Sequence, residues 1–541
     1  MREIDRLTTE RYGIPSLVLM ENAAAATARV IAARLGGELE QTSVLVLCGR
    51  GNNGGDGAAA ARLLASAGAN VQAILFGTIE ETRGDARTNF DALAGLARDS
   101  SSATGTVEFF EYAPNDARRE QLDTVFAAPH EVIVDALFGT GLTRPLEGIH
   151  RDIVQRVNHS KSDHSKNIVV SIDIPSGLNS DAAELIGEAI QADLTVTMTA
   201  PKIANVLSPA SNYNGKLIVA DIGSRAALVA EAKTNLFLTE EADARRWLVQ
   251  TRYTPDSYKN THGHALIVAG SRGFTGAAVL CANAAMRAGA GLVTVATPAS
   301  AQPLVATQVM PEVMTTALAE TDRGAVSDEA YDYFSKFSER ADVLAVGPGL
   351  SFSDDRTRKF VHSIIENRNT PVVVDADGLN CLSPWPKSLR GSRQAPIVLT
   401  PHPGEMLRLL GANDQSALKD RVEIARRFAT EHEIILLLKG NHSLVAAPDG
   451  RVFMNSTGNA GLGTAGAGDT LTGVITGFLA QAHGLGKDAE AVSTVIAALF
   501  ISGLAGDMAA REFGMRSMVA SDIREYLGRA IYSLDPRGEL P

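Results

Sequence analysis

Cysteine is scarce in this chain, which has only three among 541 residues. Cys48, Cys281 and Cys381 lie far apart, and none belongs to a CxxC pair or to a mixed Cys/His motif. This pattern excludes a disulfide framework and the common structural zinc sites. A reducing compartment, the cytoplasm, is therefore the expected location.

Positive charge is also in deficit. The chain carries 50 Lys and Arg against 62 Asp and Glu, which gives a formal net charge of −12. Such a chain is not expected to have the wide basic surface that binds nucleic acid or an anionic membrane through phosphates. Neither kind of partner is predicted.

Long apolar runs are missing as well. The most helix-like apolar stretch, residues 491–506, is shorter than the ~20 residues of a membrane helix and contains Ser, Thr and Gly. We expect it to form a buried core helix instead. The first residues, Met-Arg-Glu-Ile-Asp, do not resemble a secretory signal.

Glycine, by contrast, is abundant: it supplies 49 of 541 residues, about 9%, against a usual ~7%. Short β-branched runs alternate with Ala- and Leu-rich stretches of helical period, which is typical of parallel sheets built from βαβ units. A first series of strands is expected at residues 44–48, 71–76, 132–136, 168–172, 194–198 and 217–220. A second series is expected at residues 265–269, 292–296, 343–346, 371–375, 397–400 and 434–438.

These two series predict two sheets, with a domain boundary near residue 230. Residues 224–250, between the sheets, show no buried-strand pattern, and residues 251–264 are polar. The Ser-rich or charged stretches 100–105 and 159–166 are expected to be surface loops.

A glycine-rich segment follows the first expected strand. Residues 49–57 read Gly-Arg-Gly-Asn-Asn-Gly-Gly-Asp-Gly and are expected to open a helix over residues 58–67. Free backbone N–H groups and the positive end of a helix dipole would suit a phosphate there. The alternative is a tight turn in which glycine serves only the backbone geometry. Asn52, Asn53 and Asp56 favour a binding site, because their oxygens suit a cation or ribose hydroxyls.

Two more strand ends carry similar chemistry. Asp135 ends one strand and is followed by the turn 139–144, which contains Gly139, Gly141 and Arg144. Asp173 and Ser176 end the next strand. A helix-capping role is the alternative for any one aspartate. Ligands bind at the carboxyl ends of the strands in open α/β sheets, so three such ends together favour a site.

These segments, with Leu-Met-Glu-Asn at 19–22 and Pro201-Lys202, resemble the YjeF N-terminal family of NAD(P)H-hydrate epimerases over residues 1–225. The resemblance implies a Rossmann-like three-layer domain over residues 1–230, with Asp173 as the catalytic acid/base. Asn53, Asp135 and Ser176 would ligate K⁺. Asn179 stands where the family usually has Asp. The implied substrate contacts are Asn52, Asn53, Gly54, Gly55, Asp56, Gly139, Thr140, Gly141, Leu142, Thr143, Arg144 and Asp173.

The strongest motif of the second half is the run 458–473, in which Gly466-Ala-Gly468-Asp469 opens a helix. Backbone N–H groups there could hold a transferring phosphoryl group while Asp469 takes the proton of the attacking hydroxyl. The alternative is a glycine-rich helix start with Asp469 only offsetting the dipole. This segment resembles the anion hole and catalytic base of ribokinase-like enzymes.

Four further segments of the second half follow strands. Residues 270–278 form a glycine turn before a helix, residues 347–350 read Gly-Pro-Gly-Leu, and His402 lies in Thr-Pro-His-Pro-Gly-Glu. Residues 439–443, Lys-Gly-Asn-His-Ser, would place an ammonium beside phosphates. His402 alone could equally be a loop or core histidine. His262 and His264 have no third ligand and predict no metal site.

In this order the segments resemble the YjeF C-terminal, carbohydrate kinase-like family over residues 235–530, which comprises nucleotide-dependent NAD(P)H-hydrate dehydratases. The resemblance implies a ribokinase-like three-layer α/β/α domain over residues 231–541 that uses ADP, with Mg²⁺. Ala467 replaces a frequent Thr or Ser. Substrate would contact Ala277, Gly349, His402 and the catalytic Asp469. The nucleotide would contact Lys439, Gly440, Asn441, His442, Ser443 and Gly468.

Together the halves are similar to the fused bifunctional repair enzymes. The first would interconvert the R and S forms of NAD(P)H hydrate, and the second would dehydrate the S form at the expense of ADP, giving NAD(P)H, AMP and phosphate. A homo-oligomer is expected. The alternative is a ribokinase-like small-molecule kinase fused to a non-catalytic nucleotide-binding module.

Overall fold

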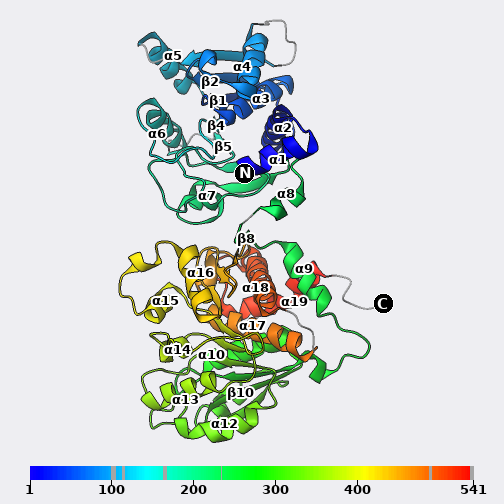
Figure 1. The fold of residues 1–541 in the computed structure, drawn as a ribbon, viewed down its shortest axis with the longest axis vertical. Coiled ribbons are helices and arrows are strands. Elements are labelled where there is room, and N and C mark those ends of the chain that lie inside the picture. The colour runs from blue at the N-terminus through cyan, green and yellow to red at the C-terminus, as the bar shows by residue number, and fades with distance from the viewer. Residues whose placement is uncertain (99–104, 113–115, 163–166, 233, 486–489, 536–541) are drawn as a thin grey trace. The chain divides into compact units, whose positions relative to one another are not determined.

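The computed structural model describes residues 1–98, 105–112, 116–162, 167–232, 234–485 and 490–535. The chain divides into two compact units, Met1–Lys233 and Thr234–Pro541 (Figure 1). The boundary expected from the sequence, after residue 230, lies just before this division. The loops expected at 100–105 and 159–166 fall largely outside the described residues, although residues 159–162 continue a helix.

The first unit contains a seven-stranded parallel sheet in the order β3-β2-β1-β4-β5-β6-β7. Chain order reverses between β1 and β4, so the helices after these strands leave toward opposite faces. The strands are β1 (Ser43–Cys48), β2 (Asn70–Phe76), β3 (Val107–Tyr112), β4 (Val132–Ala136), β5 (Ile168–Ile172), β6 (Leu194–Met198) and β7 (Lys216–Ala220).

Apolar side chains cover both faces of this sheet, as expected for buried parallel strands. Val44 and Val46 of β1 pack on one face, whereas Leu45 and Leu47 pack on the other. The first face is covered by α2, α3 and α4, and the second by α5 and α6. The helices are α1 (Arg2–Tyr12), α2 (Ser16–Arg34), α3 (Asn52–Ser66), α4 (Gly84–Ala97), α5 (Asp116–Ala127), α6 (Ile149–Ser162), α7 (Ile203–Val206) and α8 (Ala226–Glu231).

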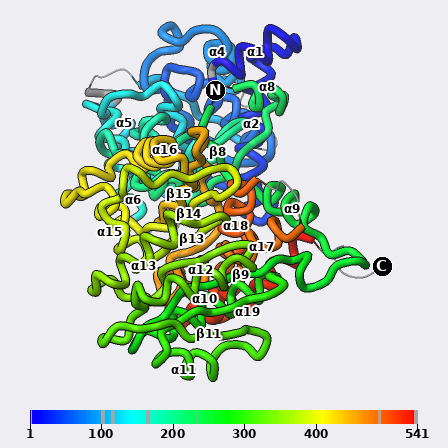
Figure 2. The backbone as a smooth tube through the Cα atoms, turned by 60° about the horizontal axis from the view of Figure 1, so that its bottom comes forward, coloured from blue at the N-terminus to red at the C-terminus, as the bar shows by residue number. Residues whose placement is uncertain are grey.

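The second unit contains a ten-stranded sheet in the order β11-β10-β9-β12-β13-β14-β15-β16-β17-β8. Figure 2 shows β15, β14, β13, β9 and β11 in this sequence. Neighbouring strands are parallel except around β16, which is antiparallel to both of its neighbours. The strands are β8 (Leu236–Leu238), β9 (His264–Val268), β10 (Leu292–Pro298), β11 (Met314–Leu318), β12 (Val343–Val346), β13 (Val372–Val374), β14 (Ile397–Leu399), β15 (Ile435–Leu438), β16 (Leu444–Ala446) and β17 (Val452–Met454).

One face of this sheet packs against α10, α17, α18 and α19 in the largest apolar core of the molecule. These sheets with helical layers confirm the predicted fold class, two α/β domains. The helices are α9 (Glu241–Gln250), α10 (Thr275–Arg287), α11 (Gln302–Ala306), α12 (Tyr331–Ser338), α13 (Asp355–Glu366), α14 (Asp377–Cys381), α15 (Pro403–Leu410), α16 (Arg421–His432), α17 (Ala467–Gly484), α18 (Ala491–Phe513) and α19 (Ala520–Leu534).

In the described part of the chain, two helices are long and apolar enough to cross a membrane by composition, α2 and α18. In α18, 72% of the most apolar segment of the helix is buried inside the protein. Val495 and Ile501, for example, lie in the core of the second unit. A long apolar helix that is mostly buried is typical of the core of a globular protein. This agrees with the expectation that residues 491–506 form a buried core helix.

Two expectations need correction. Residues 224–250 do contain a strand, β8, which pairs with β17 at the edge of the second sheet. Its three residues are only half-buried, too short and too mixed a pattern to recognise in the sequence. The glycine segment after β1 is not a loop that ends at residue 57, because α3 already begins at Asn52.

Close packing explains how a helix can begin in so many glycines. A Cβ added to Gly54 would lie 1.7 Å from the carbonyl oxygen of Gly49. One added to Gly55 would lie 2.7 Å from the Cα of Ala86 in α4, and one on Gly57 would lie 2.5 Å from the Cβ of Ala136 in β4. The glycines therefore let the first turns of α3 approach the strand end and α4.

Gly54→Ala is expected to lower the free energy of unfolding by about 3 kcal/mol, because the new methyl group meets backbone that cannot move aside. The matched control is Gly95→Ala in α4, where no atom lies within 4 Å of the added Cβ. There the higher helix propensity of alanine should stabilise by about 0.5–1 kcal/mol. Denaturant titration of the full-length chain measures both. Equal effects would contradict the packing argument.

Candidate functional sites

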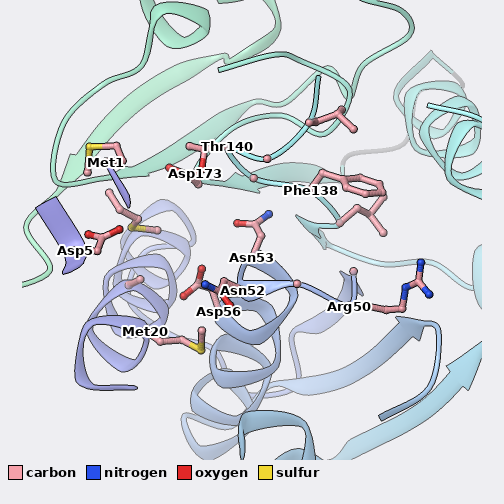
Figure 3. Close-up of a pocket in the computed structure, with 18 of the residues that line it drawn as sticks. Met1, Asp5, Met20, Arg50, Asn52, Asn53, Asp56, Phe138, Thr140 and Asp173 are labelled. Atoms are coloured by element: carbon pink, nitrogen blue, oxygen red, sulfur yellow. The ribbon is translucent and has the colours of Figure 1, made fainter. Parts of the chain in front are cut away.

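A cavity of about 700 Å³ lies at the carboxyl ends of the strands of the first sheet (Figure 3). The elements around it are the start of α3, the loop after β4, the ends of β5 and β6, and helices α1 and α2. Gly54, Gly55 and Thr143 are not among its lining residues. The predicted contact residues that do line it are Asn52, Asn53, Asp56, Gly139, Thr140, Gly141, Leu142, Arg144 and Asp173.

Asp173 is held in this cavity by an ion pair. Its Oδ1 lies 2.5 Å from the Nζ of Lys202, and the side chains are 14% and 6% exposed. Thr197 also donates to Oδ1, at 3.4 Å, and the backbone of Asp173 has a φ of 67°, which is costly for a non-glycine residue. Sequence reasoning did not assign Lys202 to the site, although Pro201-Lys202 belongs to the family resemblance.

Two further carboxyl groups face Asp173 across the cavity, those of Asp56 in α3 and Asp5 in α1 (Figure 3). Burial raises the pKa of Asp56 well above its ordinary value, and the charges of Asp173 and Asp5 raise it further. Burial also raises the pKa of Asp5. The pair Asp173–Lys202 therefore meets two carboxyl groups that hold their protons more strongly than an exposed aspartate does. Nothing in the local sequence predicted Asp5.

Two of the three predicted cation ligands, Asp135 and Ser176, are joined by hydrogen bonds, and the third, Asn53, lines the cavity. Asp135 is fully buried and accepts hydrogen bonds from the hydroxyls of Ser171 and Ser176, at 2.8 and 2.5 Å. It also accepts from the amides of Ser176 and Leu137. Asn53 is buried, and neither its Oδ1 nor its Nδ2 has a hydrogen-bond partner among the described residues.

The far end of the cavity is aromatic and basic. The ring of His150 meets that of Phe138 edge-on, with centroids 4.9 Å apart, and that of Phe76 at 6.0 Å. The Nδ1 of His150 is buried without a hydrogen-bond partner in the described chain. Arg50 lines the same end, and its Nη1 pairs with Glu81 at 3.0 Å. Figure 3 shows Arg50 and Phe138 on the opposite side from Asp5.

The second candidate site is built around the start of α17. Gly466 precedes the helix with a φ of 83°, followed by Ala467, Gly468 and Asp469 in its first turn. The amides of a first turn have no acceptor within the helix, so they can bind an anion. Burial raises the pKa of Asp469 to about 6, helped by the nearby charge of Asp375.

A buried ion pair lies against this turn. The Nζ of Lys439 is 2.8 Å from Oδ1 of Asp375, and Thr472 of α17 donates to Oδ2 at 2.8 Å. A Cβ on Gly468 would lie 3.3 Å from that Nζ. Burial alone would raise the pKa of Asp375, but the charge of Lys439 and these hydrogen bonds outweigh it and lower the pKa.

Two consequences follow for the predicted residues. The Lys439 ammonium is already paired with Asp375, so a phosphate bound beside it would share the ammonium with that carboxylate. Asp375 was not predicted as a site residue, although it directly follows β13 just as Asp135 and Asp173 stand at strand ends in the first unit.

The predicted substrate residues Ala277 and Gly349 touch each other. A Cβ on Gly349, which has a φ of +64°, would lie 3.0 Å from the Cβ of Ala277 and 2.7 Å from the carbonyl oxygen of Phe274. Gly347, two residues earlier, packs on the backbone of Asp375, where a Cβ would lie 1.8 Å from its carbonyl oxygen. These contacts link the turn after β12 to the buried ion pair.

His402 caps α15 and is half-exposed. Its Nδ1 accepts from the amides of Gly404 and Glu405, at 3.0 and 3.3 Å. The amide of Lys439 donates to the carbonyl of Pro401, so His402 lies beside the strand end that carries Lys439.

The segment from Gly440 to Ser443 forms a turn before β16. Ser443 donates to the carbonyl of Gly440 at 3.1 Å, and His442 has a φ of 49° with its Nδ1 3.1 Å from the carbonyl oxygen of Asn455. Arg421 donates to the carbonyl of Asn441 at 3.0 Å and was not predicted. In the described residues there is no group of three or more His, Cys, Asp or Glu side chains arranged for a metal.

Comparison with known proteins agrees with this geometry. A family model described as NAD(P)H-hydrate dehydratase matches residues 265–529, and one described as YjeF-related protein N-terminus matches residues 16–204. The chain is 39% identical over 539 residues to a bifunctional NAD(P)H-hydrate repair enzyme of Moorella thermoacetica, covering 100% of this chain and 97% of that one. It is 37% identical over 533 residues to the enzyme of that name from Thermofilum pendens, covering 98% and 95%.

Among solved structures, an ADP/ATP-dependent NAD(P)H-hydrate dehydratase of Bacillus subtilis, co-crystallised with ATP and Mg²⁺, matches with 29% identity and a TM-score of 0.48. The match covers 56% of this chain and 100% of that chain.

Proposed function

This chain belongs to the family of bifunctional NAD(P)H-hydrate repair enzymes, and from that premise we propose which residues carry each of its two reactions. Its function is to return hydrated NAD(P)H to NAD(P)H. Hydration adds water across a ring double bond of the dihydronicotinamide and leaves a hydroxyl at C6 in two epimers. The first unit interconverts the epimers, and the second dehydrates the S form.

Asp173 is the acid/base of epimerisation. The observation that supports this most directly is its ion pair with Lys202 inside the cavity, 2.5 Å long. Inversion at C6 requires a bond of that carbon to break and re-form on the other face. Asp173 can carry the hydroxyl proton to N1 as the C6–N1 bond opens to an aldehyde, and return it when the ring closes on the opposite face, while Lys202 holds the carboxylate in place. Asn52 and the turn Gly139–Leu142 would bind the pyrophosphate through backbone N–H groups, with Arg144 as a bidentate donor.

K⁺ would be held by Asn53, Asp135 and Ser176. The unpartnered buried amide of Asn53 fits a cation ligand, because a buried polar group without a partner is costly. A bound cation would supply positive potential at the pyrophosphate. The epimerisation rate, measured against K⁺ concentration at fixed ionic strength, should saturate.

In the second unit Asp469 is the base. The C6 hydroxyl of the S hydrate attacks the β-phosphorus of ADP, Asp469 takes its proton, and AMP leaves. The phosphate ester then eliminates phosphate together with a ring proton, which restores the double bond and yields NAD(P)H. Gly468 and the other amides of the first turn of α17 hold the transferring group. Ala277, Gly349 and His402 would line the hydrate.

ADP would lie over residues 439–443. Mg²⁺ would come with the nucleotide: this ion usually keeps several waters and takes few protein ligands besides phosphates, so it needs no cluster of carboxylates. The ionised Asp375 fixes Lys439 at the edge of the anion site. A cytoplasmic location and a homo-oligomer stay predictions.

Dehydration should weaken at low pH. A base with a pKa of about 6 loses its charge as the pH falls through that value, so kcat/KM for the S hydrate should drop about tenfold per pH unit below it. The measurement is the pH profile of absorbance recovery with saturating ADP. A flat profile between pH 5 and about 7 would show that Asp469 is not the titrating base.

The decisive experiment for the function as a whole uses separated R and S hydrates of NADH. With ADP, both should recover the absorbance of the reduced nicotinamide, and ATP should serve less well than ADP. Phosphorylation of a free alcohol without such recovery would favour the alternative, a small-molecule kinase fused to a non-catalytic module.

A further inference from the structure

The two ends of the first cavity differ in chemistry. One end carries the acid/base pair Asp173–Lys202 with Asp5, and the other carries Arg50, Phe138 and His150. The reaction at C6 needs only the first end. The aromatic end has no part in it, yet it belongs to the same continuous cavity.

The order of the strands indicates which half of a bound dinucleotide would lie at each end of the cavity. Asp173 and Lys202 follow β5 and β6, on one side of the point where strand order reverses between β1 and β4. Phe76 ends β2, and Arg50 follows β1, on the other side. Phe138 and His150 follow β4, but the ring of His150 reaches Phe76, with centroids 6.0 Å apart. A dinucleotide bound in a doubly wound sheet spans this reversal point, with its pyrophosphate over the glycine turn.

We propose that the aromatic end binds the adenosine half of the NAD(P)H hydrate, with the adenine against Phe138 and His150. In this position Arg50 faces the 2′-phosphate that distinguishes NADPH hydrate from NADH hydrate. The inference rests on the proposed epimerase site and adds the position and selectivity of its second subsite.

The aromatic groups suit a base. Phe138 and His150 meet edge-on at 4.9 Å, which leaves ring surface of both available to the cavity that they line. Burial lowers the pKa of His150, which favours the neutral form of a ring that lines the cavity. The backbone of Phe138 is fixed separately, because its amide donates to the hydroxyl of Ser176 at 2.9 Å.

Arg50 is held in place by two contacts. Its methylene groups lie on Gly77, just after β2, where an added Cβ would be 2.5 Å from Cδ. Its Nη1 is 3.0 Å from Glu81, whose other oxygen accepts from the amide of Thr78 at 2.9 Å. Glu81 thus both orients the guanidinium and offsets its charge, which predicts a moderate preference for the 2′-phosphate.

The first test compares dinucleotide and mononucleotide. Hydrated reduced nicotinamide mononucleotide lacks adenosine, so Phe138→Leu and His150→Leu should reduce kcat/KM for hydrated NADH about tenfold more than for the mononucleotide. Leucine keeps the apolar packing, and two separate variants guard against a folding defect in one. Equal losses on both substrates would overturn the adenine subsite.

The second test concerns the phosphate. Arg50→Met should lower the ratio of kcat/KM for NADPH hydrate to that for NADH hydrate about tenfold, and Glu81→Gln should raise the ratio about threefold. Arg98→Met, at the exposed end of α4, is the control for net charge and should leave the ratio unchanged. An unchanged ratio in Arg50→Met would overturn the assignment.

Binding of unmodified NADPH and NADH to the full-length chain separates this inference from the proposed activity. If the wild type does not epimerise, the proposed function fails. The subsite is still supported if Arg50→Met selectively weakens NADPH relative to NADH. If epimerisation is normal and Arg50→Met changes neither ratio, the subsite alone is wrong.

Discussion

Replacing Asp469 by Asn is expected to abolish dehydration of the S hydrate, with kcat lowered about 10³-fold. The amide keeps the shape and the hydrogen bonds of the first turn of α17 but cannot accept a proton from the C6 hydroxyl. In the wild type, burial of Asp469 and the charge of Asp375 raise the pKa of the carboxyl to about 6. A carboxyl group with this pKa is suited to act as a base near neutral pH. Absorbance recovery with ADP measures the loss.

Asp522→Asn is the matched control, because Asp522 is also the third residue of a helix, α19, where its carboxylate accepts from the amide of Val519. It should cost some stability and leave kcat unchanged. Epimerisation of the R hydrate should persist in Asp469→Asn, since Asp173 lies in the other unit. Retention of more than about a tenth of the dehydration rate would contradict the assignment of the base.

Replacing Asp173 by Asn is expected to lower epimerisation about 10³-fold while dehydration of the S form continues. The variant removes the proton acceptor and leaves the Lys202 ammonium buried without its counter-ion. Lys202→Met should reduce epimerisation less, about 10²-fold, because the carboxylate remains but is no longer held. The measurement is the disappearance of pure R hydrate by chromatography.

Asp193→Asn provides the comparison for a lysine-paired aspartate outside the cavity, since Asp193 pairs with Lys161 at 2.8 Å. It should epimerise at the wild-type rate. Normal turnover of the R form by Asp173→Asn would place the acid/base elsewhere, with Asp56 and Asp5 as the carboxyl groups to examine next.

Burial explains many of the strands that could be predicted from the sequence, although the partly exposed edge strand β7 was predicted and the buried β16 was not. The central strands, such as β1 and β4, are buried on both faces and appear as unbroken apolar runs. The edge strand β3 reads Val-Glu-Phe-Phe-Glu-Tyr and is mostly half-exposed, and β8 is three residues long. Such edges carry no pattern that separates them from loops.

The residues of the two candidate sites also fall into those that the sequence indicates and those that only the fold brings together. Asp135, Asp173 and Asp469 could be selected as candidates from the sequence because each stands at a strand end or a helix start near glycines. Two buried partners of candidate residues were not predicted: Lys202 is 29 residues from the candidate Asp173, and Asp375 is 64 residues from the candidate Lys439. Only the folded chain brings these charges together. The elevated pKa of Asp469 comes first from its burial and then from the charge of Asp375, which Lys439 partly offsets.

The glycines at the start of α3 bear on how such a sequence can change. The atoms that an added Cβ would strike at Gly54 belong to the backbone of Gly49, and no substitution shortens a backbone. A second-site mutation therefore cannot compensate for a larger residue there. The segment would resist drift even in a descendant that had lost Asp173 and its activity. The glycines would be retained because α3 packs closely on the strand end, whereas the side chains across the cavity would be retained only while the protein keeps its activity.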